Sequence, residues 1–409
     1  MGTPDVSRRG FLGVSAPDIR DEDIEELLDS IRTGWLTTGP KAEALGARLS
    51  EYLEVPFVRC LSSCTAGLLL ALKVLGVGPG DEVLVPSLTF VSCANAVVHL
   101  GATPVLVDSE PGTGHIDLTD AERRLTERTR ALMPVHLAGH PLDLDAVNAF
   151  RDRHGIAVVE DAAHAIGATW RGHPVGSHGN LTSFSFHATK NMTTFEGGAL
   201  AIEDAAVADR VLRLSLHGLT RSSWHRHRDA APALYDVPEP GYKFAMPDVS
   251  AAVGLHQLTR LDGAIRRRAE LADRYDALLA DLPLDLPPRP DDRGGHAHHV
   301  YMVRVRDDAP LERDALAAEL REEGIGTSVH FRAIHLHSYY AERLPAGDPG
   351  LPVADDLSAR LLTLPLFPAM RDADVDDVAA AVRRALGAGN RRRARLTERR
   401  RAPAPPPSA

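Results

Sequence analysis

Short apolar runs alternate with helical segments from Leu45 to about Pro247. The clearest runs are Val83–Val85, Pro104–Val107, Ala131–Val135 and Ile156–Val159, and none of them alternates with polar residues. Strands that are apolar on both faces are typical of a sheet covered by helices on both sides, so the pattern predicts a mostly parallel sheet in an α/β domain. Ligands collect at the carboxyl ends of such strands, and functional side chains are therefore expected just after each run.

Helical spacing before and after this region completes the predicted architecture. Residues Glu22 to Ile31 form a first amphipathic helix, and Val249 to Leu279 form one long helix because no proline interrupts them. After the breaker segment Pro283 to Pro290, the pattern predicts a smaller α+β unit, with a strand at Val300–Val305 and helices at Arg313–Glu323 and Val375–Leu386.

These elements divide the chain into four expected parts. Residues 1–14 form a flexible leader, 15–260 a large domain, 261–386 a small C-terminal domain and 387–409 a tail. The tail is rich in arginine and proline, cannot bury apolar surface and is expected to be disordered. Its arginines are typical of a solvated tail, with nucleic-acid binding as the alternative reading.

Composition narrows the function class. The chain has 409 residues, 44% of them hydrophobic, and a formal net charge of -10, so we expect neither a nucleic-acid partner nor a membrane surface. Three cysteines without paired spacing indicate a reducing compartment and no metal site. A pair at Arg8-Arg9 resembles an export signal, but acidic residues follow at once, and a cytoplasmic location is expected.

The densest polar signal follows the last of the four runs. Glu160 and Asp161 end that strand, His164 comes three residues later, and Lys190 follows the next predicted strand. Pyridoxal phosphate (PLP) needs a lysine amine for its Schiff base and an acid near its pyridine nitrogen. Alone, Asp161 reads as a helix cap and Lys190 as a surface group, but their joint placement predicts a PLP site.

The cofactor phosphate also needs a binding site, and Ser62 to Gly67 opens the apolar helix Leu68–Leu75. Backbone amides from Ser63 through Cys64 and Thr65 to Ala66 would point at an anion there, although capping by Ser62 or Ser63 explains the segment equally well. The Ser185 hydroxyl is a further candidate phosphate ligand. Phe90, just past an apolar strand, is the candidate ring for stacking on the cofactor, with core packing as its alternative.

Taken in order, these motifs resemble the DegT/DnrJ/StrS family of sugar aminotransferases over about residues 11 to 386. The matching segments are Thr33–Pro40, Ser62–Ala66, Pro86–Phe90, Glu160–His164, Phe186–Asn191, Gly241–Asp248, Gly324–Arg332, Ser358 and Leu364–Pro368. Within the family the details are most similar to members that make UDP-4-amino-4-deoxy-L-arabinose.

The resemblance implies the aspartate-aminotransferase fold (PLP-dependent transferase fold type I), with a seven-stranded type of central sheet, and a homodimer with active sites between subunits. Lys190, Asp161 and His164 are then the catalytic residues, His164 standing where the family has His or Gln, with a structural histidine as the alternative. The implied cofactor contacts are Thr65, Ala66, Ser185 and Phe90, with Lys243 reaching in from the partner subunit. Cys64 and Ala245 depart from the family pattern, and Ala245 removes a polar group from the cross-subunit part of the site.

The implied activity is transfer of the amino group of L-glutamate to a nucleotide-linked keto-sugar, a 4-keto-sugar being favoured, by a ping-pong mechanism. Candidate substrate contacts are Thr37, Thr38, His330, Arg332 and His335, with surface or interdomain packing as their alternative. One rival is a PLP-dependent sugar dehydratase or lyase, which Lys190 disfavours because the family's dehydratases have His there. The other is a non-catalytic PLP-binding sensor, although no helix-turn-helix DNA reader stands out.

Overall fold

The computed structural model of the chain describes residues 10–220, 234–343 and 350–401, with side chains as far as residue 387. The arginine pair at residues 8 and 9 therefore lies outside the described residues. Within these ranges no helix has both the length and the apolar character needed to cross a membrane.

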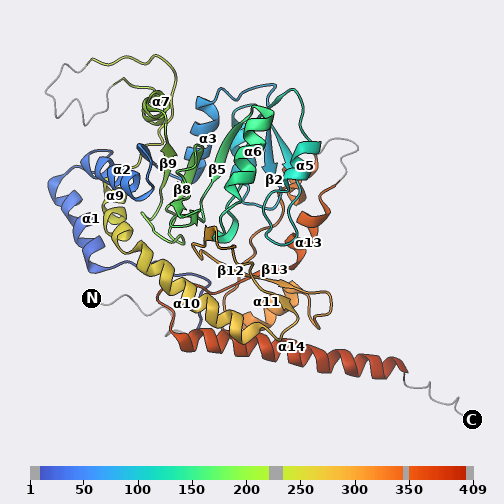
Figure 1. Ribbon diagram of the computed structural model, residues 1–409. Coiled ribbons are helices and arrows are strands. Elements are labelled where there is room, and N and C mark those ends of the chain that lie inside the picture. The colour runs from blue at the N-terminus through green and yellow to red at the C-terminus, as the bar shows by residue number, and fades with distance from the viewer. Residues whose placement is uncertain (1–9, 221–233, 344–349, 402–409) are drawn as a thin grey trace, which may run out of the picture.

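A seven-stranded sheet forms the centre of the large unit, in the order β1-β9-β8-β5-β4-β2-β3 (Figure 1). Its strands are β1 (Phe57–Leu61), β2 (Glu82–Pro86), β3 (Thr103–Val107), β4 (Thr129–Leu132), β5 (Ala157–Asp161), β8 (Leu181–Ser185) and β9 (Gly198–Ile202). Only β9 runs against the others, since both of its pairings are antiparallel while β8, β5, β4, β2 and β3 pair in parallel. The predicted α/β fold is confirmed, and the carboxyl ends of six strands share one edge.

Alternate residues of these strands enter different apolar clusters on the two faces of the sheet. Val83 and Val85 of β2 pack in the cluster that holds residues of α3 (Cys64–Val74) and α4 (Ser92–His99). Leu84, between them, packs in another cluster with residues of α5 (Leu118–Arg123) and α6 (Leu144–His154). Because both faces are buried, the strands read as continuous apolar runs in the sequence.

The other helices and strands lie around the central sheet and in the C-terminal unit. The helices are α1 (Asp21–Thr33), α2 (Pro40–Tyr52), α7 (Ala205–Ser215), α9 (Asp248–Thr259), α10 (Leu261–Leu279), α11 (Arg313–Glu322), α12 (Ser338–Ala341), α13 (Pro352–Arg360) and α14 (Asp372–Arg401). One small sheet has the order β10-β12-β13, and a second the order β11-β6-β7. Their strands are β6 (Thr169–Trp170), β7 (His173–Pro174), β10 (Leu284–Asp285), β11 (Gly294–Gly295), β12 (Tyr301–Val305) and β13 (Leu361–Leu364).

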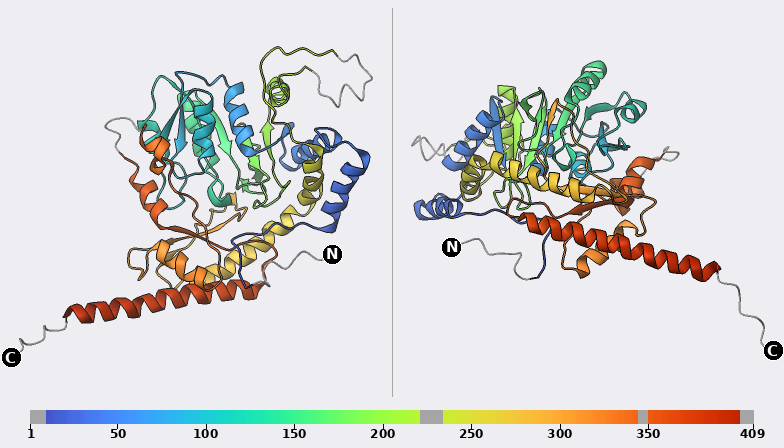
Figure 2. Two further views of the ribbon diagram at one scale, coloured as in Figure 1. Left: turned by 180° about the vertical axis from the view of Figure 1, so that it is seen from behind. Right: turned by 60° about the horizontal axis from the view of Figure 1, so that its bottom comes forward.

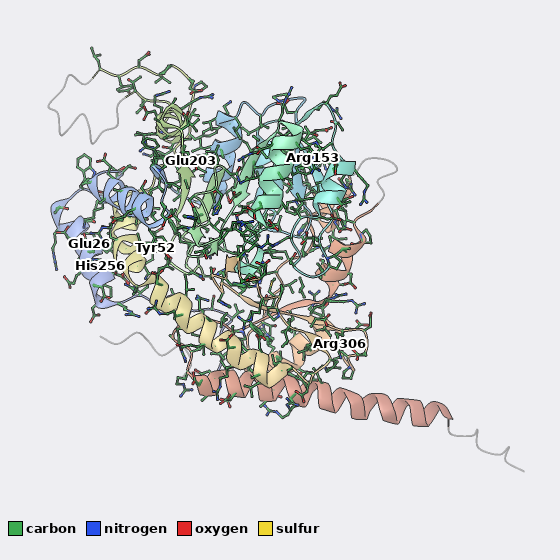
Figure 3. All side chains as sticks on the ribbon, viewed as in Figure 1. Glu26, Tyr52, Arg153, Glu203, His256 and Arg306 are labelled. Atoms are coloured by element: carbon green, nitrogen blue, oxygen red, sulfur yellow. The ribbon has the colours of Figure 1, made fainter. Side chains whose placement is uncertain are left out.

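The expected single helix from Val249 to Leu279 is two helices, α9 and α10, so that prediction was wrong. Arg260 separates them, with φ -111° and ψ 4°. Its guanidinium donates to Asp23 of α1 from Nη1 at 3.0 Å and to the Asp18 carbonyl from Nη2 at 2.9 Å. α9 also approaches α1 where His256 lies 3.2 Å from Glu26, a pair labelled in Figure 3. Tertiary contacts, rather than a local breaker residue, set this bend.

The C-terminal unit has its own apolar cluster, built between α10, α11, α14 and the β10-β12-β13 sheet. Leu271, Val303, Leu316 and Val378 are among its buried members. Figure 2 shows α10 and α14 side by side, with α14 running out beyond the rest of the molecule. α10 starts at Leu261, and this residue still packs in the apolar cluster that holds residues of α2 and β1. The expected domain boundary between residues 260 and 261 stays a prediction.

Both chain ends differ from the expected flexible segments. Leu12, expected in a flexible leader, pairs with Ile325 through a bond from its amide to the Gly324 carbonyl at 2.7 Å, because its apolar side chain packs on the C-terminal cluster. α14 continues past residue 387 to Arg401, through a segment rich in arginine, which is a good helix former. The prolines of the expected tail lie outside the described residues.

Candidate active site

A cavity of about 340 Å³ opens at the carboxyl edge of the central sheet. Nine of the residues singled out in the sequence line it together: Ser63, Cys64, Thr65, Phe90, Asp161, His164, Ser185, Lys190 and His330. Most of them follow strands β1, β2, β5 and β8, whose common direction brings residues far apart in the chain to one edge.

Lys190 lies on a tight turn after β8. Its amide donates to the His187 carbonyl at 2.9 Å, and the amide of Thr194 returns to the Phe186 carbonyl at 2.9 Å. Burial lowers the pKa of the Lys190 amine to about 8, against an opposing effect of the Asp161 charge. The two groups therefore face the same cavity closely enough to interact electrostatically, which is the arrangement that the sequence predicts.

Asp161 ends β5 and is almost wholly buried, with 3% of the residue exposed. Its Oδ1 accepts the Ala163 amide at 2.9 Å, and its Oδ2 lies 3.0 Å from the Cys93 thiol. Cys93, which the sequence analysis did not single out, thus belongs to the surroundings of the site.

Aromatic and histidine rings pack around His164 at the cavity. The ring centroid of His164 lies 4.4 Å from that of His299 and 5.8 Å from that of Phe331. Nδ1 of His164 accepts the Ala138 amide at 3.2 Å, and burial, with Lys190 and His330 adding to it, holds its pKa well below the usual range. His164 is therefore a neutral ring that both lines the cavity and is bonded to the framework.

Sequence reasoning missed His299, whose ring lies within hydrogen-bonding distance of the lysine amine. Its Nε2 lies 3.5 Å from Nζ of Lys190, and its Nδ1 lies 3.2 Å from Oδ1 of Asn191. Arg268, fully buried on α10, donates from Nη1 to the His299 carbonyl at 3.0 Å. The only local signal was the histidine cluster His296-Ala297-His298-His299 just before β12, which has no spacing typical of a ligand set.

The N-terminus of α3 meets the cavity at Ser63, Cys64 and Thr65. Ser63 caps the helix, since its Oγ accepts the Ala66 amide at 3.1 Å. The segment therefore both caps the helix and lines the cavity, as an anion site would. Ala66 is not among the residues lining the cavity, and its amide already donates to Ser63. Gly198 permits the close approach of this helix, because a Cβ at that position would lie 2.5 Å from the Cys64 nitrogen.

Phe90 stands at the cavity wall with 57% of its surface exposed, so it is not core filler. Its ring centroid lies 6.0 Å from that of Phe331. An exposed aromatic face beside the cavity suits stacking on a planar ligand. The anion-attracting helix end, the buried carboxylate, the amine and this ring together fit PLP. Among the described residues no group of three or more acidic, histidine or cysteine side chains is arranged to hold a metal ion.

The remaining predicted residues lie outside this cavity. Lys243 is exposed and pairs with Leu216, and Arg332 is exposed with Nη2 donating to the Leu336 carbonyl at 2.7 Å. Thr38, together with Ala245, lines a second cavity of about 360 Å³ along α2, while Thr37 is exposed beside it. His335 is bonded on both ring nitrogens, 2.6 Å from Ser87 Oγ and 2.8 Å from Asp355 Oδ1, so it has no nitrogen left for a substrate.

Comparisons with known proteins agree with this geometry. The DegT/DnrJ/EryC1/StrS aminotransferase family matches residues 17–383. The spore coat polysaccharide biosynthesis protein SpsC of Bacillus subtilis (strain 168) is 43% identical over 378 residues, which cover 92% of this chain and 97% of that protein.

Solved structures give the same result. The PLP form of the putative sugar aminotransferase Spr1654 from Streptococcus pneumoniae superimposes with a TM-score of 0.86 at 35% identity, over 93% of this chain and 99% of that one. Helicobacter pylori PseC, an aminotransferase involved in the biosynthesis of pseudoaminic acid, superimposes with a TM-score of 0.86 at 25% identity, over 92% of this chain and 100% of that one.

Proposed function

The chain belongs to the DegT/DnrJ/EryC1/StrS aminotransferase family, and we propose that it moves the amino group of L-glutamate onto a nucleotide-linked keto-sugar, with Lys190 as the residue that anchors PLP. The family and its relatives make the chain a PLP-dependent sugar aminotransferase. A 4-keto-sugar is the favoured acceptor. The observation that carries the residue assignment is the joint placement of Lys190, Asp161 and Phe90 around one cavity.

The residues of the cavity fit the parts of the cofactor. PLP supplies an aldehyde that bonds to amines and a ring that takes up the electron pair of an adjacent carbanion. Asp161 would face the ring nitrogen, and Phe90 and His164 would flank the ring. The α3 N-terminus at Cys64 and Thr65, together with the Ser185 hydroxyl, would attract the phosphate.

Lys190 is also suited to move a proton. An amine with a pKa of about 8 is neutral in about one molecule in ten at pH 7, so it is able both to accept a proton and to return one. A solvated lysine, with a pKa of about 10.4, would be neutral in fewer than about one molecule in a thousand. Burial of the amine therefore raises the supply of free base by roughly two orders of magnitude.

A homodimer completes the proposal. Lys243 lies outside its own chain's cavity, so a contact between this lysine and the cofactor phosphate requires a second copy of the chain. Thr37, Thr38 and Arg332 are also outside it, and we assign them to the nucleotide-sugar side of a cleft completed by the second subunit. His330, on the wall of the cavity with Nδ1 bonded to Thr363 Oγ1 at 2.7 Å, has Nε2 left for the substrate.

The proposal is tested by two half-reactions followed by absorbance. L-Glutamate added to the holoenzyme should convert the PLP spectrum to that of pyridoxamine phosphate, with 2-oxoglutarate formed in equal amount. A panel of nucleotide keto-sugars, varied in keto position, then shows which one restores the first spectrum. The Lys190→Ala variant should lose both the anchored-cofactor absorbance and turnover.

The outcomes separate the alternatives. A PLP spectrum that glutamate leaves unchanged, together with elimination of water from a sugar substrate, would indicate a dehydratase. Binding of PLP without either reaction would indicate a sensor. Turnover by the Lys190→Ala variant would contradict the assignment of that residue while leaving the family membership intact.

A further inference from the structure

Two of the three cysteines lie against the carboxylate of Asp161. The Cys93 Sγ is 3.0 Å from Oδ2, and the Cys64 Sγ is 3.6 Å from Oδ1. Both thiols are buried, with exposures of 0% for Cys93 and 7% for Cys64. The third cysteine, Cys60, lines the other cavity along α2. The two buried sulfurs therefore contact the one carboxylate that the proposed function assigns to the cofactor ring.

The two contacts differ in strength. Cys64 has competing partners, since its sulfur lies 3.3 Å from the Ser183 hydroxyl and 3.5 Å from the Ser183 carbonyl. The next partner of Cys93 is the Thr89 hydroxyl at 3.8 Å, which is longer than its contact with Asp161 by 0.8 Å. Of the two thiols, Cys93 therefore forms the stronger hydrogen bond with the carboxylate.

Both thiols carry their protons at neutral pH. Burial raises the pKa of each well above the usual range, and the negative charge of Asp161 raises it further. Each sulfur is then an S–H group beside a carboxylate oxygen, and it donates rather than accepts. Buried, protonated thiols are also poor nucleophiles, so these cysteines are not sites of covalent chemistry.

The donors around Asp161 leave its carboxylate with few free hydrogen-bond acceptor positions. A carboxylate has about four acceptor positions on its two oxygens. The Ala163 amide and the Cys64 and Cys93 thiols lie within bonding distance of three of them. About one position then remains, and because Asp161 lines the cavity, that position is available to a donor in the cavity.

We propose that Cys93 is a positioning residue, which holds Oδ2 of Asp161 so that the carboxylate presents its remaining lone pair to the ring nitrogen of PLP, with Cys64 as a weaker second support. This rests on the proposed function, which assigns Asp161 to the ring nitrogen. Cys93 is in the first turn of α4, and its amide donates to the Phe90 carbonyl at 3.4 Å. The first turn of α4 thus links the support of the carboxylate to the backbone of Phe90.

The test compares Cys93→Ala, which removes the donor, with Cys93→Ser, which retains one. Cys60→Ser is the matched control. The full-length apoprotein is titrated with PLP carrying ¹⁵N in its ring, giving the dissociation constant and the ¹⁵N chemical shift of the bound cofactor. Wild type, Cys60→Ser and Cys93→Ser should show a protonated ring nitrogen. Cys93→Ala should bind PLP roughly five- to tenfold more weakly and shift the ¹⁵N signal toward neutral pyridine.

Circular dichroism and thermal unfolding check that every variant is folded before its ¹⁵N shift is interpreted. Cys93→Val, which fills the volume without a donor, replaces the alanine variant if that one does not fold. A wild-type ¹⁵N shift in Cys93→Ala or Cys93→Val would overturn the proposal. Equal ¹⁵N shifts in the serine and alanine variants would also overturn it, because packing alone would then explain both.

Failure of the proposed function and failure of the role of Cys93 give different results. If glutamate leaves the wild-type spectrum unchanged while the serine and alanine variants still differ in ¹⁵N shift, Cys93 positions Asp161 in a PLP protein of another activity. If glutamate reacts and the ¹⁵N shifts are equal, the transamination stands and the role of Cys93 is excluded.

Discussion

Nζ of Lys190 lies 3.5 Å from Nε2 of His299. Asn191 fixes the tautomer of that histidine, because its Nδ2 donates to the Ala297 carbonyl at 2.6 Å and leaves Oδ1 to accept from His299 Nδ1 at 3.2 Å. Nε2 then carries the lone pair and accepts from the amine. Burial, with the charge of Lys190 adding to it, keeps the pKa of His299 well below the usual range, so this neighbour adds no charge.

The first prediction concerns the pH dependence of cofactor capture. Only the neutral amine of Lys190 attacks an aldehyde, and its pKa is about 8. The rate at which the apoenzyme binds PLP covalently should rise about tenfold per pH unit below pH 8 and level off above it. Stopped-flow absorbance across the pH range measures this. An inflection near pH 10 would show that the amine is solvated.

His299→Ala should move that inflection upward. Loss of the ring admits water to the amine, so desolvation weakens and the pKa of Lys190 rises toward its ordinary value. Capture at pH 7 should then be slower by about fivefold or more. His256→Ala, on α9 beside Glu26, is the control histidine and should leave the profile unchanged.

The second prediction separates cofactor affinity from stability at Phe90. Because 57% of this side chain is exposed, Phe90→Leu should change the free energy of unfolding of the apoprotein by less than about 0.5 kcal/mol. Loss of the stacking ring should weaken PLP binding by about three- to tenfold. Urea unfolding and a PLP titration measure the two quantities. Phe195→Leu, 43% exposed and outside the residues that line the cavity, is the matched control.

The third prediction concerns the start of α2. Asp248, 1% exposed, accepts the amides of Gly39 at 2.8 Å, Lys41 at 3.1 Å and Ala42 at 3.0 Å. Asp248→Ala leaves these amides without their acceptor and should lower the free energy of unfolding by about 2–3 kcal/mol, with Asp248→Asn losing less.

Urea unfolding measures this loss, and a surface aspartate provides the comparison. Asp209, whose side chain is 69% exposed, forms a 3.5 Å ion pair with Arg59, and Asp209→Ala should cost under about 1 kcal/mol. Equal losses in the two alanine variants would contradict the role of Asp248 as a helix cap.

The sequence predicted those parts of the site that follow from strand direction. Asp161 ends an apolar run and Lys190 follows the next predicted strand. Parallel strands bring their carboxyl ends together, so a local pattern was enough. The same pattern did not indicate His299, which is 109 positions from Lys190 and meets it only because the C-terminal unit folds back onto the large one. His335 was assigned to the substrate because a histidine offers donors, and only its neighbours show that both nitrogens are used.

The sequence pattern also failed to predict helix ends that depend on residues distant in the chain. Arg260 carries no local helix-breaking property, yet its ion pairs with the segment around Asp23 separate α9 from α10. Asp248 caps a helix that begins more than 200 residues earlier. Spacing rules describe contacts within a few residues, whereas these contacts arise from the packing of whole elements.

The pairing of Leu12 with the segment at Gly324 and Gly326 means that the C-terminal unit is not a continuous stretch of chain. The Gly326 amide donates to the Leu12 carbonyl at 2.7 Å, and the Leu366 amide to the Val14 carbonyl at 3.2 Å. A fragment excised at residue 261 would lack one edge of its own fold. During synthesis, residues 10–16 must wait for more than 300 later residues before their binding partners exist, so this unit is the last to close.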